Sequence, residues 1–421
     1  MPRFDPARPA PVRFEALDSW RGICALMVAM MHFPASGPLS ESALLRNAFL
    51  FVDYFFVLSG FVIAHGFAPR LSGGLDYARF VVTRFGRIYP LHAAVLLAFA
   101  AWEVARLLVP ALRGAGPAPF GAGHTVPELL SSFALLDGLG LAGGLSWNGP
   151  SWSIAAEFWT YLLFGLAVVA LGRRYWLALL PAILAGPAIL YLRSPDYMNA
   201  TWDYGFLRCL YGFSLGALVY VVAGPGLVAA HRRGPSRRLL WTAVECAALA
   251  AVAAFVALAG GNAAGIAAPF VFAAALLVFA REAGLVSHML RRRAFLWLGA
   301  LSYAIYMVHI FVQSRMINAA TLVEKLTDLD LVGDFTMSGE RFYGFGVQGP
   351  LVGTLALGAM VVAVVAVALL AHVAIERPCQ RLSRRLAARL GEPRFEPSPQ
   401  PVLATVPVRC DAPAFPRPHR S

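Results

Sequence analysis

The sequence is poor in charge. Only 14% of its 421 residues are Asp, Glu, Lys or Arg, and lysine occurs once, at Lys325. Soluble domains carry about 25% charged residues, so this deficit excludes an ordinary soluble domain. Apolar residues make up 59% of the chain instead, and the mean hydropathy is +0.65. Many apolar runs approach the ~20 residues that a helix needs to cross a bilayer. The composition therefore indicates a polytopic membrane protein.

Cysteine spacing of the kind that binds metals is also missing. The five cysteines are scattered along the chain and no CxxC pair occurs; they are Cys24, Cys209, Cys246, Cys379 and Cys410. We therefore expect isolated thiols, no metal site and no permanently bound cofactor. No internal sequence repeat is visible either, which argues mildly against a transporter built from repeats.

The net charge of +12 comes almost entirely from arginines in short loops between apolar runs. Positive residues gather in the cytoplasmic loops of membrane proteins. The charge therefore indicates a membrane topology, with the lipid bilayer as a partner and no nucleic acid. The alanine- and arginine-rich composition is typical of a high-GC bacterial genome, so we expect a bacterial inner-membrane protein.

Eleven apolar runs are candidates for crossing helices. They lie near residues 16–36, 47–67, 88–108, 128–143, 151–171, 176–193, 204–222, 239–259, 262–280, 295–314 and 350–375. The run 128–143 is the shortest and lies between glycine-rich loops. If it does not cross, every Arg-rich loop lies on the cytoplasmic side, as do both termini. We therefore predict an all-α, polytopic helix bundle of about ten transmembrane helices, with 109–149 as an outer or re-entrant segment.

Three parts of the chain follow from this topology. Residues 1–15 are a cytoplasmic N-terminal segment, and 16–385 are the integral-membrane domain. Residues 386–421 are largely Pro-rich and polar without periodicity, which predicts a disordered cytoplasmic tail.

The first apolar run carries an ionisable residue at each end. In RGICALMVAMMH, Arg21 and His32 are separated by ten residues. On a helix this spacing puts them about 20° apart around the axis and about 16 Å apart along it. An arginine at the interface can extend its charge into water. A histidine deep in a membrane helix is by default a functional candidate.

The same topology places other ionisable residues in the outer half of the membrane, near His32. Asp53 and Glu157 lie about two turns inside their helices, while Arg208 and His309 lie in the outer halves of theirs. Isolated in lipid, each would be costly. We therefore expect these residues to surround a polar cavity.

Arginines form a second group, on the cytoplasmic side. Arg84 and Arg87 are three residues apart and share a helix face if the third helix begins early, and Arg21 lies at the same level. Guanidinium groups match phosphate oxygens, which favours a polyphosphate ligand. Ordinary positive-inside charge is the alternative interpretation of each arginine.

Six segments resemble motifs of the membrane-bound acyltransferase-3 family, in the family's order. RGICALMVAMMH resembles its Arg-X10-His signature and FVDYFFVLSGFVIA its second-helix motif. RFGRIYPLH is similar to its Arg-X-X-Arg stretch, and WSIAAEFWTYLLF to its Trp-Ser-x-x-x-Glu segment. LSYAIYMVHIF and IERP resemble motifs of its last two helices. The resemblance extends from about Arg13 to Arg385.

The resemblance implies an O-acyltransferase. Such an enzyme moves an acyl group, often acetyl, from cytoplasmic acyl-CoA to a hydroxyl of a carbohydrate or cell-surface glycan. O-acetylation of a polysaccharide is one such activity. The sequence departs from the family where two consecutive glutamates are often found, because Ala156 precedes the single Glu157.

Ester formation needs a base for the acceptor hydroxyl and stabilisation of the tetrahedral oxyanion. We expect His32 to be the base, with a carboxylate orienting its imidazole as in a catalytic triad. The arginines would bind the phosphates of acyl-CoA, the co-substrate. The expected catalytic residues are His32, Glu157 and Asp53, and the expected acyl-CoA-binding residues are Arg21, Arg84 and Arg87.

Other residues are candidates for binding or covalent roles. Ser59 and Ser153 are possible nucleophiles for an acyl-enzyme, although serines in membrane helices more often pack helices together. The expected substrate-binding residues are Trp152, Ser153, Arg208 and His309. Trp147, Trp152, Trp159 and Tyr161 form either a sugar platform or the interfacial aromatic belt of a membrane protein.

A proton-coupled membrane transporter is the alternative function. Buried charges around a mid-membrane histidine suit a proton relay. A transporter would not consume acyl-CoA and would not need the Arg84 and Arg87 pair, so the chemistry distinguishes the two functions.

Overall fold

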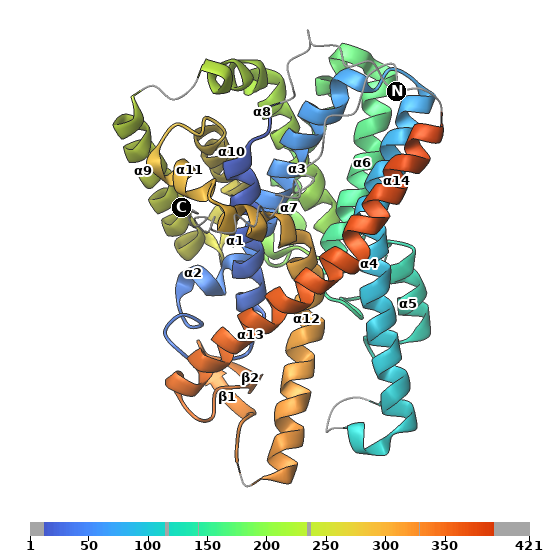
Figure 1. Cartoon of the computed structure of the whole chain (residues 1–421), viewed down its shortest axis with the longest axis vertical. Helices are drawn as coiled ribbons and strands as arrows, with labels where there is room; N and C mark the ends of the chain where they lie inside the picture. Colours follow the sequence, from blue (N-terminus) through green and yellow to red (C-terminus); the bar gives the residue numbers. More distant parts are fainter. Residues whose placement is uncertain (1–11, 114–117, 142, 234–236, 328, 391–421) are drawn as a thin grey trace, which may run out of the picture.

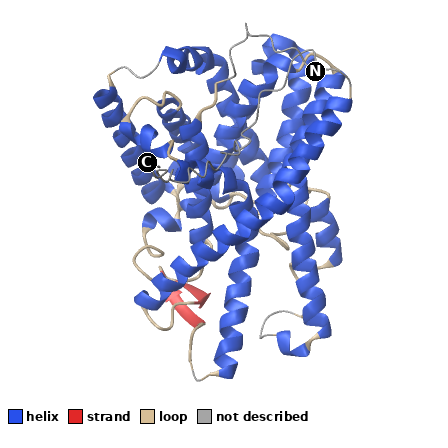
Figure 2. Ribbon diagram, viewed as in Figure 1, coloured by secondary structure: helices blue, strands red, loops and turns tan. Residues whose placement is uncertain are grey.

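The computed structural model describes residues 12–113, 118–141, 143–233, 237–327 and 329–390. These residues form a bundle of helices with a β-hairpin at one end, as Figure 1 and Figure 2 show. The helices are α1 (Glu15–Met31), α2 (Ala43–Arg46), α3 (Phe51–Phe67), α4 (Gly74–Leu108), α5 (Val126–Phe133), α6 (Ser151–Leu171), α7 (Leu180–Arg193), α8 (Gly205–Arg233), α9 (Arg238–Ala259), α10 (Ala268–Phe279), α11 (Leu285–Leu290), α12 (Arg293–Leu326), α13 (Pro350–Ala371) and α14 (Arg377–Arg389). The hairpin pairs β1 (Gly333–Met337) with β2 (Glu340–Gly344) in antiparallel fashion.

Among the described residues, seven helical segments are long and apolar enough to cross a membrane. One of them, Ser151–Arg193, contains both α6 and α7, joined by a 3₁₀ helix. The helices α1 and α10, with 17 and 12 residues, fall below the length that defines these segments. The prediction of an all-α, polytopic membrane bundle is confirmed, while the number of ten crossings stays a prediction.

The bundle has two distinct ends, and Figure 1 shows them at the top and bottom. We call the top the arginine end, because α1 begins there next to Arg13 and α14 packs there against the start of α4. The other, the hairpin end, carries β1 and β2. The segment after α1 reaches the hairpin end, where Ala35 forms a bridge with Phe345.

The helices differ in how much protein surrounds them. In the segment Ala48–Arg70, which contains α3, 72% of the most apolar window is buried inside the protein. The corresponding share is 22% both for α9 and for the segment Pro350–Arg389. The core of the bundle therefore lies around α3, while α9 and α13 turn apolar side chains outward, as helices that face lipid do.

Two boundaries differ from the predicted ones, while the short helix in the expected outer segment is consistent with the prediction that this segment does not cross. Residues 74–87, expected in a cytoplasmic loop, are the first turns of α4, which continues through Pro90. The expected outer segment 109–149 contains the eight-residue helix α5, which at about 12 Å is too short to cross a bilayer. Helix α14 continues to Arg389, so the first residues of the predicted tail are helical. The remainder of that tail, 391–421, lies outside the described residues, as do residues 1–11.

Glycines set the spacing of the helices that carry the candidate site. A Cβ on Gly22 would lie 2.5 Å from the carbonyl carbon of Leu298, and one on Gly299 would lie 2.3 Å from the carbonyl oxygen of Asp18. Small residues let membrane helices approach closely. The two glycines therefore let α1 and α12 pack in backbone contact, which holds the face of Arg21 against α12.

Candidate active site

A cavity lies among α1, α3, α4, α6 and α12. Five arginines line it, together with a group of hydroxyl and carboxylate side chains. The arginines are Arg13, Arg21, Arg70, Arg84 and Arg87, and the other polar residues include Ser59, Ser153, Glu157, Tyr161, Ser302, Tyr303 and Tyr306. The three arginines expected to bind acyl-CoA are thus brought together in one cavity, with the expected catalytic Glu157 inside it.

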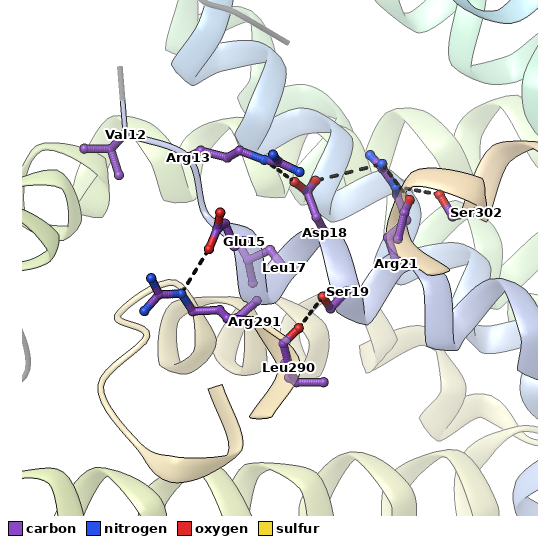
Figure 3. A network of polar contacts seen from close by, with 12 residues as sticks. Val12, Arg13, Glu15, Leu17, Asp18, Ser19, Arg21, Leu290, Arg291 and Ser302 are labelled. Carbon is purple, nitrogen blue, oxygen red and sulfur yellow. Dashed lines mark hydrogen bonds and ion pairs between the residues drawn. The ribbon is translucent and has the colours of Figure 1, made fainter. Parts of the chain in front are cut away.

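Arg21 is held firmly in the cavity wall, as Figure 3 shows. Its Nε donates a hydrogen bond to the Ser302 hydroxyl at 2.8 Å, and one terminal nitrogen donates to the Gly299 carbonyl at 3.2 Å. Asp18 lies 3.9 Å from the same guanidinium and also accepts from Arg13 at 2.8 Å. The two hydrogen bonds to α12 therefore fix the orientation of Arg21, and Asp18 balances part of its charge.

Arg84 is bound much less completely, although it is only 4% exposed. Its guanidinium lies 4.6 Å from the centre of the Phe67 ring, and its buried Nε has no hydrogen-bond partner among the described residues. Electrostatic interactions connect Arg84 to Glu157 and Tyr161, as well as to Arg87. A buried cationic donor without a partner is costly, so the cavity favours an anionic or strongly accepting ligand.

Ser59, Glu157 and Tyr161 form a compact hydrogen-bond group in the cavity. The Ser59 hydroxyl donates to Oε1 of Glu157. The Tyr161 hydroxyl donates to the same oxygen at 2.5 Å and lies 2.9 Å from the Ser59 hydroxyl. Glu157 and Tyr161 are four residues apart and therefore share one face of α6. The carboxylate thus contacts a serine and a tyrosine, and none of its hydrogen bonds involves His32.

The position of Ser59 depends on its neighbour Gly60. A Cβ on Gly60 would lie 1.9 Å from the carbonyl oxygen of Phe213 on α8, and one on Gly216 would lie 1.8 Å from that of Val57. Helices α3 and α8 therefore touch along these glycines. Because Gly60 faces α8, Ser59 is turned to the cavity.

His32 and His309 meet on the other side of Tyr306. Nε2 of His309 lies 3.3 Å from Nδ1 of His32. Nδ1 of His32 also lies 2.9 Å from the Val28 carbonyl, and Nδ1 of His309 lies 2.7 Å from the Tyr306 carbonyl. Tyr306 itself lines the cavity and packs against His309, with ring centres 5.8 Å apart.

These contacts determine which imidazole nitrogens carry protons. A carbonyl oxygen only accepts, so both Nδ1 atoms are protonated and donate. The Nδ1 proton of His32 is then shared by two acceptors, the Val28 carbonyl and Nε2 of His309. Nε2 of His32 carries no proton and keeps a free lone pair. His309 is fully buried, whereas His32 is exposed. An exposed, unprotonated imidazole nitrogen is suited to take a proton from a hydroxyl group.

Asp53 and Arg208 form a separate buried ion pair. Nε and Nη2 of Arg208 donate to the two carboxylate oxygens at 2.9 and 2.8 Å, and both side chains are 1% exposed or less. Arg208 also donates to the carbonyls of Ala200 and Phe49 at 3.0 and 2.9 Å, and it lies 5.4 Å from the Trp152 ring. The three expected site residues Asp53, Arg208 and Trp152 thus lie together, and none of them is among the residues that line the cavity.

The structure also shows the surroundings of Ser153 and of the aromatic residues that could have formed a sugar platform. The Ser153 hydroxyl lies 3.0 Å from the Pro150 carbonyl and 2.8 Å from the Tyr306 hydroxyl. Trp147, Trp152 and Tyr161 are only 4%, 5% and 3% exposed. They pack inside the protein and do not form an open platform for a sugar.

Tyr306 is a residue that the sequence reasoning missed. It contacts Ser153 on the cavity side and His309 on the other side. The signal was present in LSYAIYMVHIF, because Tyr306 and His309 are three residues apart and must share a helix face.

A family model and two known proteins match parts of this chain. A family model described as an acyltransferase domain matches residues 14–372. The chain is similar to Acyltransferase MdmB of Streptomyces mycarofaciens, with 30% identity over 93% of this chain and 98% of that protein. It is also similar to Protein 2 in picA locus of Rhizobium radiobacter, with 35% identity over 35% of this chain and 78% of that protein. No solved structure matches. The chain therefore belongs to the membrane-bound acyltransferase-3 family, and it is an acyltransferase.

Proposed function

We propose that the protein is an integral-membrane O-acyltransferase that moves an acyl group, acetyl in the first instance, from acyl-CoA to a hydroxyl of a carbohydrate or cell-surface glycan. The observation that carries the proposal is the exposed His32, held by His309 so that its Nε2 lone pair is free. The acyltransferase family supplies the reaction class.

The arginine-lined cavity is the proposed donor site. Coenzyme A carries several phosphate groups, and guanidinium groups bind phosphate through paired hydrogen bonds. Arg84 offers a buried donor without a protein partner, while Arg21 and Arg87 lie in the same lining. The positive-inside rule assigns the arginine end to the cytoplasm, where acyl-CoA is made. This orientation puts both termini on the cytoplasmic side of a bacterial inner membrane.

His32 is the proposed general base for the acceptor hydroxyl. Its Nε2 takes the proton as the hydroxyl oxygen attacks the acyl carbon, and the bond to His309 keeps the ring oriented. The hydrogen bond between the Nδ1 proton of His32 and the Val28 carbonyl stabilises the imidazolium that forms. General-base catalysis of this kind contributes about 10²- to 10⁴-fold in rate.

The two expected carboxylates receive different roles in this proposal. Glu157 acts inside the donor cavity, because it contacts Ser59 and Tyr161 there. Asp53 is a positioning residue, because its carboxylate is occupied by Arg208 and ties α3 to α8. The carbohydrate acceptor rests on the resemblance to the family, and His32 and His309 are the residues proposed to meet it.

Acyl transfer in lipid nanodiscs tests the proposal. The protein is incubated with radiolabelled acetyl-CoA and a glycan extract of its host, beside His32→Ala and His32→Gln. We expect label to enter the glycan with the wild type and to fall by about 10²-fold or more in both variants. Matched thermal unfolding of all three proteins controls for folding.

Two results would contradict the proposal. The first is full transfer by a folded His32→Ala protein, which would remove His32 as the base. The second is a wild-type protein that consumes none of the acyl-CoA donors offered. In that case acyl-CoA would not be the donor of this acyltransferase, and the assignment of the arginine-lined cavity would fall with it.

A further inference from the structure

The donor cavity and the histidine pair lie on opposite sides of Tyr306. The cavity lining contains Ser59, Glu157 and Tyr306, but neither His32 nor His309 is among the described residues that line it. The Tyr306 hydroxyl is bonded to Ser153 on the cavity side, and its ring packs against His309 and also against Phe55 at 5.9 Å. A thioester held within this lining would contact Ser59 and Glu157 before it reached the histidine pair.

We propose that the acyl group is passed through a covalent acyl-enzyme on Ser59, formed in the donor cavity and resolved by an acceptor hydroxyl that His32 deprotonates. This inference rests on the proposed function, since it requires an acyl-CoA donor and a hydroxyl acceptor. It adds a nucleophile and divides the reaction into two half-reactions.

The surroundings of Ser59 are those of an activated nucleophile. A serine hydroxyl needs an adjacent base to attack a carbonyl, and the Ser59 hydroxyl donates directly to the Glu157 carboxylate. The bond from Tyr161 to the same oxygen fixes the position of that carboxylate. Removed from bulk water, such electrostatic contacts act strongly.

Arg84 supplies the positive charge that the first half-reaction needs. When a nucleophile adds to a thioester, negative charge develops on the carbonyl oxygen. The buried Nε of Arg84 is a donor without a partner, and Arg84 interacts electrostatically with Glu157 in the same cavity. Positive charge from Arg84 therefore reaches the first half-reaction through its electrostatic interaction with Glu157, while its partnerless Nε remains the proposed contact for a CoA phosphate.

Ser153 is the other serine in the cavity, and its contacts are different. Its hydroxyl bonds to the Pro150 carbonyl and the Tyr306 hydroxyl. None of the hydrogen bonds described for Ser153 reaches a carboxylate or an imidazole. Without a base in contact, a serine hydroxyl is a poor nucleophile. The contacts of Ser153 therefore do not support it as the nucleophile.

The first half-reaction exchanges one ester for another. The Ser59 oxygen forms a bond to the acyl carbon, and its proton passes to the Glu157 carboxylate. The tetrahedral intermediate collapses as the carbon–sulfur bond breaks, and the departing CoA thiolate takes the proton back from Glu157. The products are the Ser59 ester and free CoA thiol, with Glu157 again ionised.

The second half-reaction releases the acyl group to the acceptor. His32 takes the proton of the acceptor hydroxyl while its oxygen forms a bond to the acyl carbon. The bond from that carbon to the Ser59 oxygen breaks, and this oxygen recovers a proton from the His32 imidazolium. The proposal requires the Tyr306 side chain to move before the two can meet, which breaks its hydrogen bonds with the Ser153 hydroxyl and the Pro150 carbonyl.

Labelling without an acceptor tests the first half-reaction alone. Wild-type protein in nanodiscs is mixed with radiolabelled acetyl-CoA, and both protein-bound label and free CoA thiol are measured. We expect a burst of CoA thiol that approaches one equivalent per chain, with equal label on the protein. Peptide mass spectrometry should find the added acetyl group on Ser59.

Four variants distinguish the residues. Ser59→Ala and Glu157→Gln should lose the burst and the label, whereas Ser314→Ala, at a serine of α12 outside the cavity lining, should keep both. His32→Ala should keep the burst and the label but fail to deliver the acyl group to the glycan extract.

A fifth variant gives a positive signature if Ser59→Ala merely misfolds. Ser59→Cys places a thiol in the same position, so its acyl adduct is a thioester. Neutral hydroxylamine should release that label rapidly, while the ester label on the wild type should resist it.

The outcomes separate the covalent step from the proposed function. Transfer to glycan by the wild type with no burst and no label would show direct transfer and would overturn the acyl-enzyme. Label that persists in Ser59→Ala, or a burst that disappears in His32→Ala, would overturn it as well. If the wild type gives neither label nor transfer with any acyl-CoA, the proposed function fails with it.

Discussion

Arg84 and Arg208 are two arginines buried to nearly the same extent, 4% and 1% exposed, and they are bound in opposite ways. Arg208 donates four hydrogen bonds, two of them to the Asp53 carboxylate. Arg84 leaves its Nε without a partner beside the cavity. A buried charge that the protein satisfies completely holds helices together. One that the protein leaves unsatisfied marks the place where a ligand completes the contacts.

The comparison of the two arginines first predicts that breaking the Asp53–Arg208 ion pair strongly lowers the stability of the fold. Asp53→Ala leaves the Arg208 guanidinium buried without its counter-charge, and breaking a buried ion pair in this way costs about 3–5 kcal/mol. Thermal unfolding in detergent, followed by tryptophan fluorescence, measures the change. A stability equal to that of the wild type would show that the pair does not hold α3 to α8.

Substitution of Arg84, whose Nε has no hydrogen-bond partner among the described residues, should affect activity more than stability. Arg84→Gln removes a charge whose Nε donates no hydrogen bond to the described residues, so stability should fall less than in Asp53→Ala. Since a hydrogen bond to a charged group is worth about 1.5–3 kcal/mol, kcat/KM for acyl-CoA should fall roughly 10- to 100-fold. Steady-state CoA release measures this effect. Arg291→Gln, an exposed arginine outside the cavity, is the matched control and should leave kcat/KM unchanged.

Glu282 extends the comparison to a buried carboxylate that is partly satisfied. One oxygen accepts the Ala16 N–H at 2.8 Å, while the other has no hydrogen-bond partner among the described residues and lies 3.4 Å from Arg291. Burial is the largest effect and raises the pKa of Glu282 from 4.5 to about 7. Because the folded state holds this proton more tightly than the unfolded chain, Glu282 makes the fold less stable as pH rises from about 4.5 to about 7.

The measurement for Glu282 is the pH dependence of thermal unfolding. Glu282→Gln should flatten the fall in stability over that range, by about 3 kcal/mol at its upper limit. Unchanged slopes in the variant and the wild type would show that another group titrates. His231, which lies 3.7 Å from the Glu282 carboxylate, is the first to examine.

The sequence predicted the helices best within the apolar runs, because the thickness of the membrane determines the length and hydropathy of a crossing helix. The run at 47–67 became α3 with little change, because length and hydropathy determine a crossing segment. Helix ends outside the apolar runs were not predictable in this way. Helix α12 continues to Leu326, beyond the apolar run that ends near 314. The hairpin of β1 and β2 turns at Ser338 and Gly339, whose positive φ angles of 53° and 84° suit a tight turn.

The site was predictable only within single helices. Helical periodicity placed Arg21 and His32 on one face of the first helix. Periodicity could not predict the contacts between helices, because these depend on how α3, α8 and α12 pack against one another. Asp53 was expected beside His32 and instead pairs with Arg208, while His32 contacts His309. Membrane depth alone does not distinguish these partners.

The account depends most directly on what the unsatisfied Arg84 binds. Isothermal titration of CoA into the intact protein in nanodiscs tests it, with Arg84→Gln and Arg291→Gln measured beside the wild type. We predict that the wild type and Arg291→Gln bind CoA equally, and that Arg84→Gln binds it roughly 10-fold or more weakly. Equal binding by Arg84→Gln and the wild type, or no binding by either, would contradict the assignment of the cavity as the donor site.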